Sequence, residues 1–113
     1  MKKVLIVQPV EGLSQEEKKN TLNEACQYLT SKEFEPIFYT SPLIEENIAN
    51  TLGIKNTYLY YISNMFDYMS KVDCVYFTDG WLSSKDCRVI RLAAVLYDIE
   101  ILSDNEITNK ALE

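Results

Sequence analysis

The chain has 113 residues, of which 47% are hydrophobic and 25% are charged, and this length and composition suit one compact globular domain. Its formal net charge of -6 argues against nucleic acid as a partner, because DNA- and RNA-binding proteins use Lys and Arg side chains to neutralise phosphates. The absence of histidine excludes a zinc site and a Ser/His/Asp triad, and no glycine-rich nucleotide-binding motif occurs, so we expect no metal and no cofactor.

The cysteines and the apolar runs bear on the cellular compartment. The three cysteines are an odd number and fall in a predicted helix, a strand and a helix start, so we expect no disulfide bond. The apolar run that follows Lys2 and Lys3 is too short for a signal peptide, and no run reaches transmembrane length. These features predict a cytoplasmic protein with no membrane partner.

The first predicted elements are a strand and a helix. Residues 3–7, KVLIV, are a short continuous run of mostly branched apolar side chains, which is typical of a strand buried on both faces of a parallel sheet. Ser14 and Glu17 have the spacing of a capping box and predict a helix over residues 15–30. One apolar stripe on this helix consists of Leu22, Ala25, Cys26 and Leu29.

A second strand and a short helix follow. Residues 35–40, EPIFYT, predict a strand, and Pro36 favours a strand start or a sheet edge. Ser41 and Pro42 have the pattern of an N-cap followed by proline at the first helical position, and Gly53 marks a helix end. The helix between them would carry Ile44, Ile48 and Leu52.

The segment 57–71 predicts a helix with two apolar rows. The rows are Leu59, Ile62, Phe66 and Met69, and beside them Tyr58, Tyr61, Met65 and Tyr68. The first row can pack on the sheet, and two interpretations of the tyrosine-rich row stay open. Its tyrosines lie over the domain's own surface with their hydroxyl groups in water, or they form a subunit interface, where Tyr and Met are enriched. The second interpretation predicts a homo-oligomer.

The last third of the chain continues the alternation. Residues 72–78, VDCVYFT, predict a strand, residues 85–97 a helix and residues 99–102 a short fourth strand. The expected main stripe of the helix is Val89, Leu92, Ala93 and Leu96. Residues 104–113 are polar and are expected to form a tail outside a single domain of residues 1–103.

Strands that alternate with helices predict an α/β fold in which helices flank both faces of a parallel sheet. Right-handed crossovers leave few topologies, so we expect a single flavodoxin- or Rossmann-like domain of about four strands in the order 2-1-3-4. Ligands bind such sheets beyond the carboxyl ends of the strands, at the switch point between strands one and three. The loops at that edge contain Gln8, Pro9, Glu11, Gly12, Tyr39, Thr40, Thr78, Asp79, Gly80 and Trp81.

The start of helix 85–97 is a candidate anion site, because free backbone N–H groups and the positive end of the helix dipole favour a phosphate. Ser83, Ser84 and Asp86 lie there, and Lys85 would add positive charge. In the alternative interpretation one of the serines is only an N-cap and Lys85 is only a solvated charge. Trp81 would either stack on a ligand ring or lie as a lid on the core.

Several segments together resemble a known family. They are IVQPVEGL with the capped helix behind it, TYLYYISNMFDYMSKVDCVYFTDGW, and KDCRV at the next helix start. They resemble the small nucleoside 2-deoxyribosyltransferase-like proteins common in phages and bacteria, over nearly the whole chain. The most specific parts are Gln8, Pro9 and Gly12, Asp73 with Val75, Tyr76 and Phe77, Gly80 with Trp81, and Cys87 with Arg88. The resemblance implies a nucleoside or nucleotide ligand.

The sequence departs from that family at the catalytic position. The family's first loop reads S-Q-P-M-x-G, and its last helix begins G-C-R-I-E-H, with a glutamate that attacks the anomeric carbon. In the first loop, Val7 matches the serine, Val10 the methionine and Glu11 the variable position. In the last helix, Asp86 matches the glycine, Ile90 the glutamate and Arg91 the histidine. Ile90 takes the glutamate's place and has no nucleophilic atom, and no Asp or Glu lies between Arg88 and Tyr97.

Two further acidic residues match positions near the family pocket. Asp79 is expected to contact the ligand through a ribose hydroxyl or a base nitrogen. Asp73 begins a strand, far from the carboxyl edge, and is expected to cap the turn before it.

Three functional interpretations stay open. The first is capture of a nucleoside, a nucleotide or a nucleotide-derived signal without cleavage, and in a phage protein acting in the host cytoplasm, sequestering a host immune nucleotide would be one use. The second is an active N-glycosidase or deoxyribosyltransferase whose nucleophile has moved to Asp79, Asp86 or Glu11. The third is an oligomeric protein-interaction module that works through the tyrosine-rich row.

Overall fold

The computed structural model describes residues 1–39 and 46–102. The expectations for Thr40, Ser41, Pro42, Ile44 and the tail 104–113 lie outside these residues. In chain order the elements are β1 (Lys3–Val7), α1 (Gln15–Ser31), β2 (Glu35–Ile37), α2 (Glu46–Leu52), α3 (Thr57–Met69), β3 (Cys74–Phe77), the 3₁₀ turn η1 (Trp81–Ser83), α4 (Lys85–Leu96) and β4 (Glu100–Leu102).

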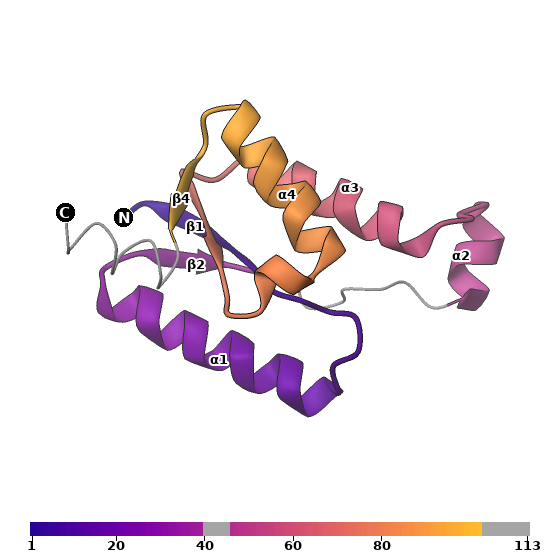
Figure 1. Ribbon diagram of the computed structural model, residues 1–113, viewed down its shortest axis with the longest axis horizontal. Coiled ribbons are helices and arrows are strands. Elements are labelled where there is room, and N and C mark those ends of the chain that lie inside the picture. Colours follow the sequence, from indigo (N-terminus) through magenta and orange to yellow (C-terminus); the bar gives the residue numbers. More distant parts are fainter. Residues whose placement is uncertain (40–45, 103–113) are drawn as a thin grey trace.

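The strands form one four-stranded parallel sheet in the order β2-β1-β3-β4, which confirms the predicted α/β class and strand order. β1 is an inner strand that pairs with β2 from Lys3 to Leu5 and with β3 from Val4 to Val7. Helix α1 covers one face of the sheet, and α3 and α4 cover the other (Figure 1). Because helices lie on both faces, β1 and β3 are almost entirely buried, as their continuous apolar runs predict.

Helix α1 begins where the capping box predicts. Ser14 Oγ accepts a hydrogen bond from the Glu17 N–H at 3.1 Å, and Glu17 Oε1 accepts one from the Ser14 N–H at 3.4 Å. The apolar stripe of α1 then meets the sheet. Its fully buried side chains join a cluster that consists of Val4, Ile6, Ala25, Leu29, Cys74 and Tyr76.

The predicted main stripe of α4 is wrong except at Ala93, which packs partly buried against the core. The helix buries Asp86, Cys87, Ile90 and Ala94. Val89, Leu92 and Leu96, which were expected to face the sheet, are exposed. Apolar side chains occur on most sides of this helix, so periodicity alone does not single out the buried side. The sheet selects the side with the smaller Cys87 and Ala94, which let the helix lie close to it.

The two rows of α3 are also not separated in the way the spacing predicts. The helix buries Tyr61 and Met65 of the tyrosine-rich row together with Ile62 and Met69 of the other row, while Phe66 is partly exposed. The buried side lies between the two rows, because α3 packs both on the sheet and beside α4. Tyr61 and Met65 therefore belong to the core of the protein and are not available to an oligomer interface.

The edge of the sheet is shorter than predicted. β2 ends at Ile37, and Pro36 lies in this edge strand, where a missing backbone donor is tolerated. Helix α2 buries Ala49, whereas Ile48 and Leu52 are exposed. Figure 1 shows α2 projecting beyond the end of α3, away from the sheet. This position explains why the larger apolar side chains of α2 do not reach the core.

Candidate functional site

The loops that follow β1 and β3 lie side by side at the carboxyl edge of the sheet. The Thr78 N–H donates to the carbonyl oxygen of Val7 at 3.0 Å, which extends the pairing beyond the last residue of β3. Gly80 has φ +88°, a conformation that favours glycine, and a Cβ atom there would lie 3.6 Å from Pro9 Cγ. The two loops thus meet at the predicted switch point.

A cavity of ≈ 370 Å³ lies at these loops and the start of α4. It is lined by Pro9, Glu11, Leu13, Asp79, Gly80, Ser83 and Ser84. The structure therefore brings together predicted site residues that are about 70 positions apart in the sequence. The volume lies within the roughly 300–1,000 Å³ that is usual for small-molecule sites.

A second cavity of ≈ 400 Å³ lies on the α1 side of the same edge. It is lined by Thr21, Glu24, Ala25, Tyr28, Tyr76, Thr78 and Asp79. Asp79 lines both cavities, so they are neighbours. Thr78 is only 5% exposed, and its Oγ1 atom forms no hydrogen bond within the described part of the chain. The same holds for the buried Oε1 atom of Gln8 on the first loop, so two buried acceptors remain near this edge.

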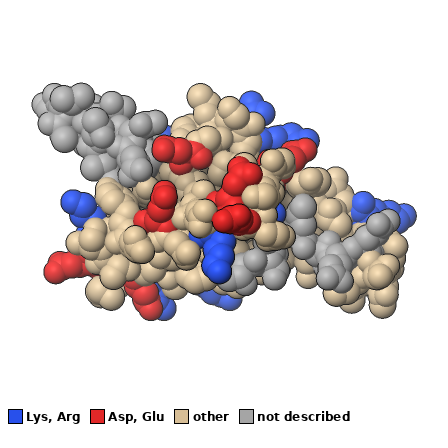
Figure 2. Space-filling view, turned by 90° about the horizontal axis from the view of Figure 1, so that it is seen from below, with Lys and Arg blue, Asp and Glu red and all other residues tan. Residues whose placement is uncertain are grey.

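Negative charge dominates this edge. Glu11 and Asp79 line the first cavity, Glu24 and Asp79 line the second, and among the residues that the structure describes no Lys or Arg lines either one. Figure 2 views the protein from the α1 side and shows Asp and Glu side chains gathered over the middle of this face. The pKa of Asp86, which is 5% exposed, is raised by burial and by the charge of Glu11, and the nearby Lys85 partly offsets the rise.

The start of α4 has mainly structural contacts. Ser84 Oγ accepts a hydrogen bond from the Cys87 N–H at 3.3 Å and is the N-cap of the helix. The side chain of Lys85 is exposed and lines neither cavity. Gly12 supplies a turn with φ +79° without lining either cavity. A phosphate is not favoured at this helix end, because acidic side chains lie nearby and Ser84 already accepts a hydrogen bond from one of the free backbone N–H groups.

Trp81 and Arg88 line neither of the two cavities. They line a shallow hollow of ≈ 250 Å³ along α4, together with Arg91, Leu92 and Val95. The Arg91 guanidinium carbon is 4.2 Å from the centre of a Trp81 ring, and Trp81 also packs against Phe77 with ring centroids 5.9 Å apart. These contacts pack Trp81 against the core, and its side chain does not join the first cavity although Gly80 and Ser83 beside it do.

Tyr39, from the loop after β2, does not line the two cavities at the switch point either. Its ring packs against Tyr61 and Tyr68, at centroid distances of 6.2 and 5.7 Å. Burial raises the pKa of Tyr39, and Tyr60 and Tyr68 raise it further. The rim at this switch point is thus formed by the β1 and β3 loops.

Ile90, which the resemblance matches to the nucleophile of deoxyribosyltransferase-like proteins, belongs to the core. Ile90 is fully buried in a cluster that includes Tyr61, Met65 and Cys87. It lines neither cavity at the carboxyl edge. An acid in this position would lose its water shell, whereas Glu11 and Asp79 reach the first cavity from the loops.

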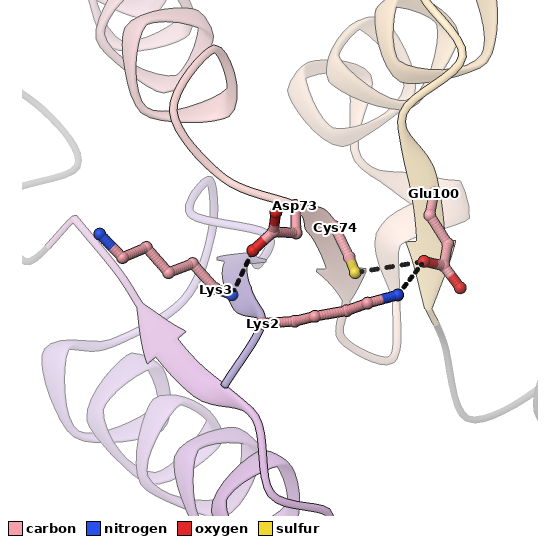
Figure 3. A network of polar contacts seen from close by, with 5 residues as sticks. All are labelled: Lys2, Lys3, Asp73, Cys74 and Glu100. Carbon is pink, nitrogen blue, oxygen red and sulfur yellow. Dashed lines mark hydrogen bonds and ion pairs between the residues drawn. The ribbon is translucent and has the colours of Figure 1, made fainter.

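Asp73 lies at the opposite, amino-terminal edge of the sheet (Figure 3). Its Oδ2 atom accepts the Lys3 N–H at 2.8 Å. Beside it, Cys74 Sγ donates to Glu100 Oε2 at 3.4 Å, and Lys2 Nζ lies 3.5 Å from the same oxygen. Asp73 therefore joins the starts of β1 and β3. Its acceptor role links two strands and is not the local cap that was expected.

The sequence interpretation missed several residues that line the cavities. Leu13 borders the first cavity, and Thr21, Glu24 and Tyr28 of α1 border the second. The α1 residues recur at intervals of three and four, so they share one helix face next to the buried stripe. In the sequence, a row of polar residues next to the buried stripe of a helix indicates that these residues can line a cavity.

Comparisons with protein-family models, with curated proteins and with solved structures found no match to this chain. Within residues 1–39 and 46–102, no helix combines the length and apolar character needed to cross a membrane. The same residues contain no group of three or more His, Cys, Asp or Glu side chains arranged to hold a metal ion.

Proposed function

We propose that this protein binds a nucleoside at the carboxyl edge of its sheet and holds it without cleavage. The observation that carries the proposal is the meeting of Glu11, from the β1 loop, and Asp79, from the β3 loop, at one cavity of suitable size. Carboxylates accept hydrogen bonds from the vicinal hydroxyl groups of a sugar. The choice of a nucleoside over another polyhydroxyl compound rests on the resemblance to deoxyribosyltransferase-like proteins.

The charge of the site favours a nucleoside over a nucleotide. A phosphate at these cavities would lie near Glu11, Asp79 and Glu24, and no cationic side chain of the described ranges lines the cavities to compensate. Like charges a few ångströms apart repel by about 1 kcal/mol in water and by more where water is excluded. Hydroxyl and amino groups of a neutral ligand would instead act as donors to the carboxylates.

Capture without cleavage fits the residue at the nucleophile position. Ile90 has no ionisable atom and is fully buried, so α4 offers no carboxylate to an anomeric carbon there. Sequestration of a nucleoside-derived molecule, inside a host cell if the protein is encoded by a phage, is the biological use that we propose.

The test is native mass spectrometry of the protein with a panel of nucleosides and their 5′-monophosphates. We expect retention of at least one nucleoside and weaker retention of its monophosphate. Asp79→Asn should weaken nucleoside binding by about tenfold or more, because a hydrogen bond to a charged group contributes about 1.5–3 kcal/mol. Asp98→Asn is the matched control, since Asp98 lines none of the cavities described and Asn tolerates its φ of 57°.

Two results would contradict the proposal. One is a folded protein that retains no nucleoside at any concentration tested. The other is tighter binding of the monophosphates than of the nucleosides, which would show that the carboxylates do not select against a negatively charged ligand.

Hydrolysis of an N-glycosidic bond is the second candidate function, and Asp86 favours it. Asp86 lines neither cavity, but the charge of Glu11, which lines the first cavity, helps to raise its pKa. A carboxyl with a raised pKa suits a general acid that protonates a departing base, while Glu11 or Asp79 activates water or attacks the sugar. The same mass spectra distinguish the candidates. Release of free base that Asp86→Asn abolishes would support hydrolysis, and retention without release would support capture.

A further inference from the structure

The outer face of α4 is apolar and exposed. Val89, Leu92, Val95 and Leu96 are between 42% and 67% exposed on this one helix. From Arg88 to Tyr97 the chain contains no acidic residue, although the whole protein has 17 acidic and 11 basic residues. Contiguous apolar surface of this kind, bordered by charged residues, is typical of an interaction site.

The exposed side chains form a continuous stripe along the helix. Val89, Leu92 and Leu96 recur at intervals of three and four, and Arg88 and Val95 lie beside Leu92 on the neighbouring row. The stripe adjoins a groove of ≈ 410 Å³ between α3 and α4. The groove is lined by Phe66, Met69, Ser70, Ala93, Tyr97 and Ile99. This surface lies on the side of the sheet opposite α1 (Figure 1), so a partner here leaves the α1 side open.

We infer that a second copy of this chain docks on this face, with the two α4 helices antiparallel and a two-fold axis near Leu92. The spacing of the stripe is self-complementary about that residue, because Val89 lies three positions before it and Leu96 four positions after it. An antiparallel pair centred there places Val89 of each copy against Leu96 of the other. The same patch then serves both subunits, as a closed dimer requires.

Charge also matches a second copy in this orientation. Arg88 is exposed in the first half of α4, and Asp98 follows the C-terminal end of the helix. The antiparallel arrangement brings Arg88 of each copy toward the end of the partner helix, where the carbonyl groups and Asp98 carry negative charge. With a net charge of -6, two copies repel through most of their surface. The acid-free face of α4 is where that repulsion is small.

Analytical ultracentrifugation over about 1 µM to about 1 mM tests the dimer, since interfaces of moderate affinity dissociate in that range. We expect a reversible monomer–dimer equilibrium. Leu92→Glu should raise the dissociation constant by at least about tenfold, because the two-fold axis introduces the charge on both sides of the contact. Leu52→Glu is the matched control, since Leu52 on α2 is 61% exposed and Leu92 is 60% exposed. The control should leave the equilibrium unchanged.

A cross-linking experiment tests the position of the axis. Leu92→Cys, in a Cys26→Ser background, should give a covalent dimer with a short bismaleimide, and Leu52→Cys in the same background should not. A monomer at every concentration would overturn the inference. A dimer that persists in Leu92→Glu, or that cross-links only through residue 52, would overturn it as well, whatever the outcome for nucleoside binding.

Discussion

Ile90 has the surroundings of a core residue, although the resemblance to deoxyribosyltransferase-like proteins matches it to their nucleophile. Its side chain is fully buried among Tyr61, Met65 and Cys87. A glutamate at this position would lose its hydration without a basic partner among these neighbours. The buried position thus favours an apolar residue, and an isoleucine agrees with the packing of α4.

An acid at this position should therefore damage the fold and give no transferase activity. We expect Ile90→Glu to lower the free energy of unfolding by several kcal/mol, because an unpaired buried charge is costly. Ile90→Val is the control and should cost about 0.5–1.5 kcal/mol. Urea unfolding followed by circular dichroism measures both. A stable Ile90→Glu protein that releases base from nucleosides would contradict this account.

Asp86 should make the stability of the protein depend on pH. Burial and the charge of Glu11 raise its pKa, so the folded state binds this proton more tightly than the unfolded state. The group favours folding most below its unfolded pKa of about 3.9, and that contribution is lost as pH rises through the folded pKa.

Asp86→Asn removes this titration. The gain in free energy of unfolding that Asn gives relative to Asp should therefore be larger at pH 7 than at pH 3. Urea unfolding over a pH series measures the trend, and Glu11→Gln should reduce it, because the Glu11 charge is its second cause. A difference in stability between the unsubstituted protein and the Asp86→Asn variant that stays constant with pH would rule out this role for Asp86.

Among the helices, α1 is the one whose start follows most directly from local sequence. Ser14 and Glu17 satisfy each other's backbone N–H groups, and the helix begins at the next residue after Ser14. These contacts span three residues, so no tertiary partner is needed to create them.

The cap makes a testable contribution to stability. Ser14→Ala should lower the free energy of unfolding by about 1 kcal/mol, because the Glu17 N–H loses its acceptor. Ser31→Ala is the matched control at the other end of α1. The Ser31 hydroxyl only donates to the Tyr28 carbonyl at an exposed site, so its loss should change stability by less than about 0.5 kcal/mol. Equal losses in the two variants, measured by chemical denaturation, would argue against the cap.

Helices α3 and α4 show the limit of periodicity at the level of elements. Both have apolar residues on more than one side, and each buries a side that spacing alone does not identify. On α4 the sheet buries Cys87, Ile90 and Ala94, and the larger Leu92 and Leu96 stay outside. The choice depends on how closely each helix approaches the sheet and its neighbour, which is a property of the assembled layers.

In the whole molecule, the inner strands should be the most stable part. β1 is paired along both sides and buried from Val4 to Val7, whereas β2 and β4 are three-residue edge strands. Opening β1 would expose both faces of the sheet, so it requires nearly global unfolding.

Hydrogen exchange followed by NMR tests this hierarchy. We expect the slowest amides in β1 and β3, and much faster exchange in α2, whose Ile48 and Leu52 side chains lie outside the core. Protection of α2 or β4 equal to that of β1 would contradict the expected order of local opening.

Local patterns in the sequence determined the element types, the α1 cap and the parallel sheet. The continuous apolar runs at 3–7 and 72–78 indicate strands buried on both faces, and alternation with helices leaves few strand orders. The edge where a ligand would bind follows from that order. These properties depend on short-range spacing and on general rules of connection, so the sequence suffices for them.

Only the tertiary structure decided which side chains share a space. It joins Glu11 and Asp79 at one cavity, places Trp81 and Arg88 at a different hollow, and buries Ile90 and Tyr61 in the core. It also exposes the apolar stripe of α4 that spacing assigned to the sheet. Packing couples residues that are far apart in the chain, and small differences in volume select the buried side of a helix. The spacing of apolar residues along a single segment shows neither these long-range contacts nor the space available to each side chain.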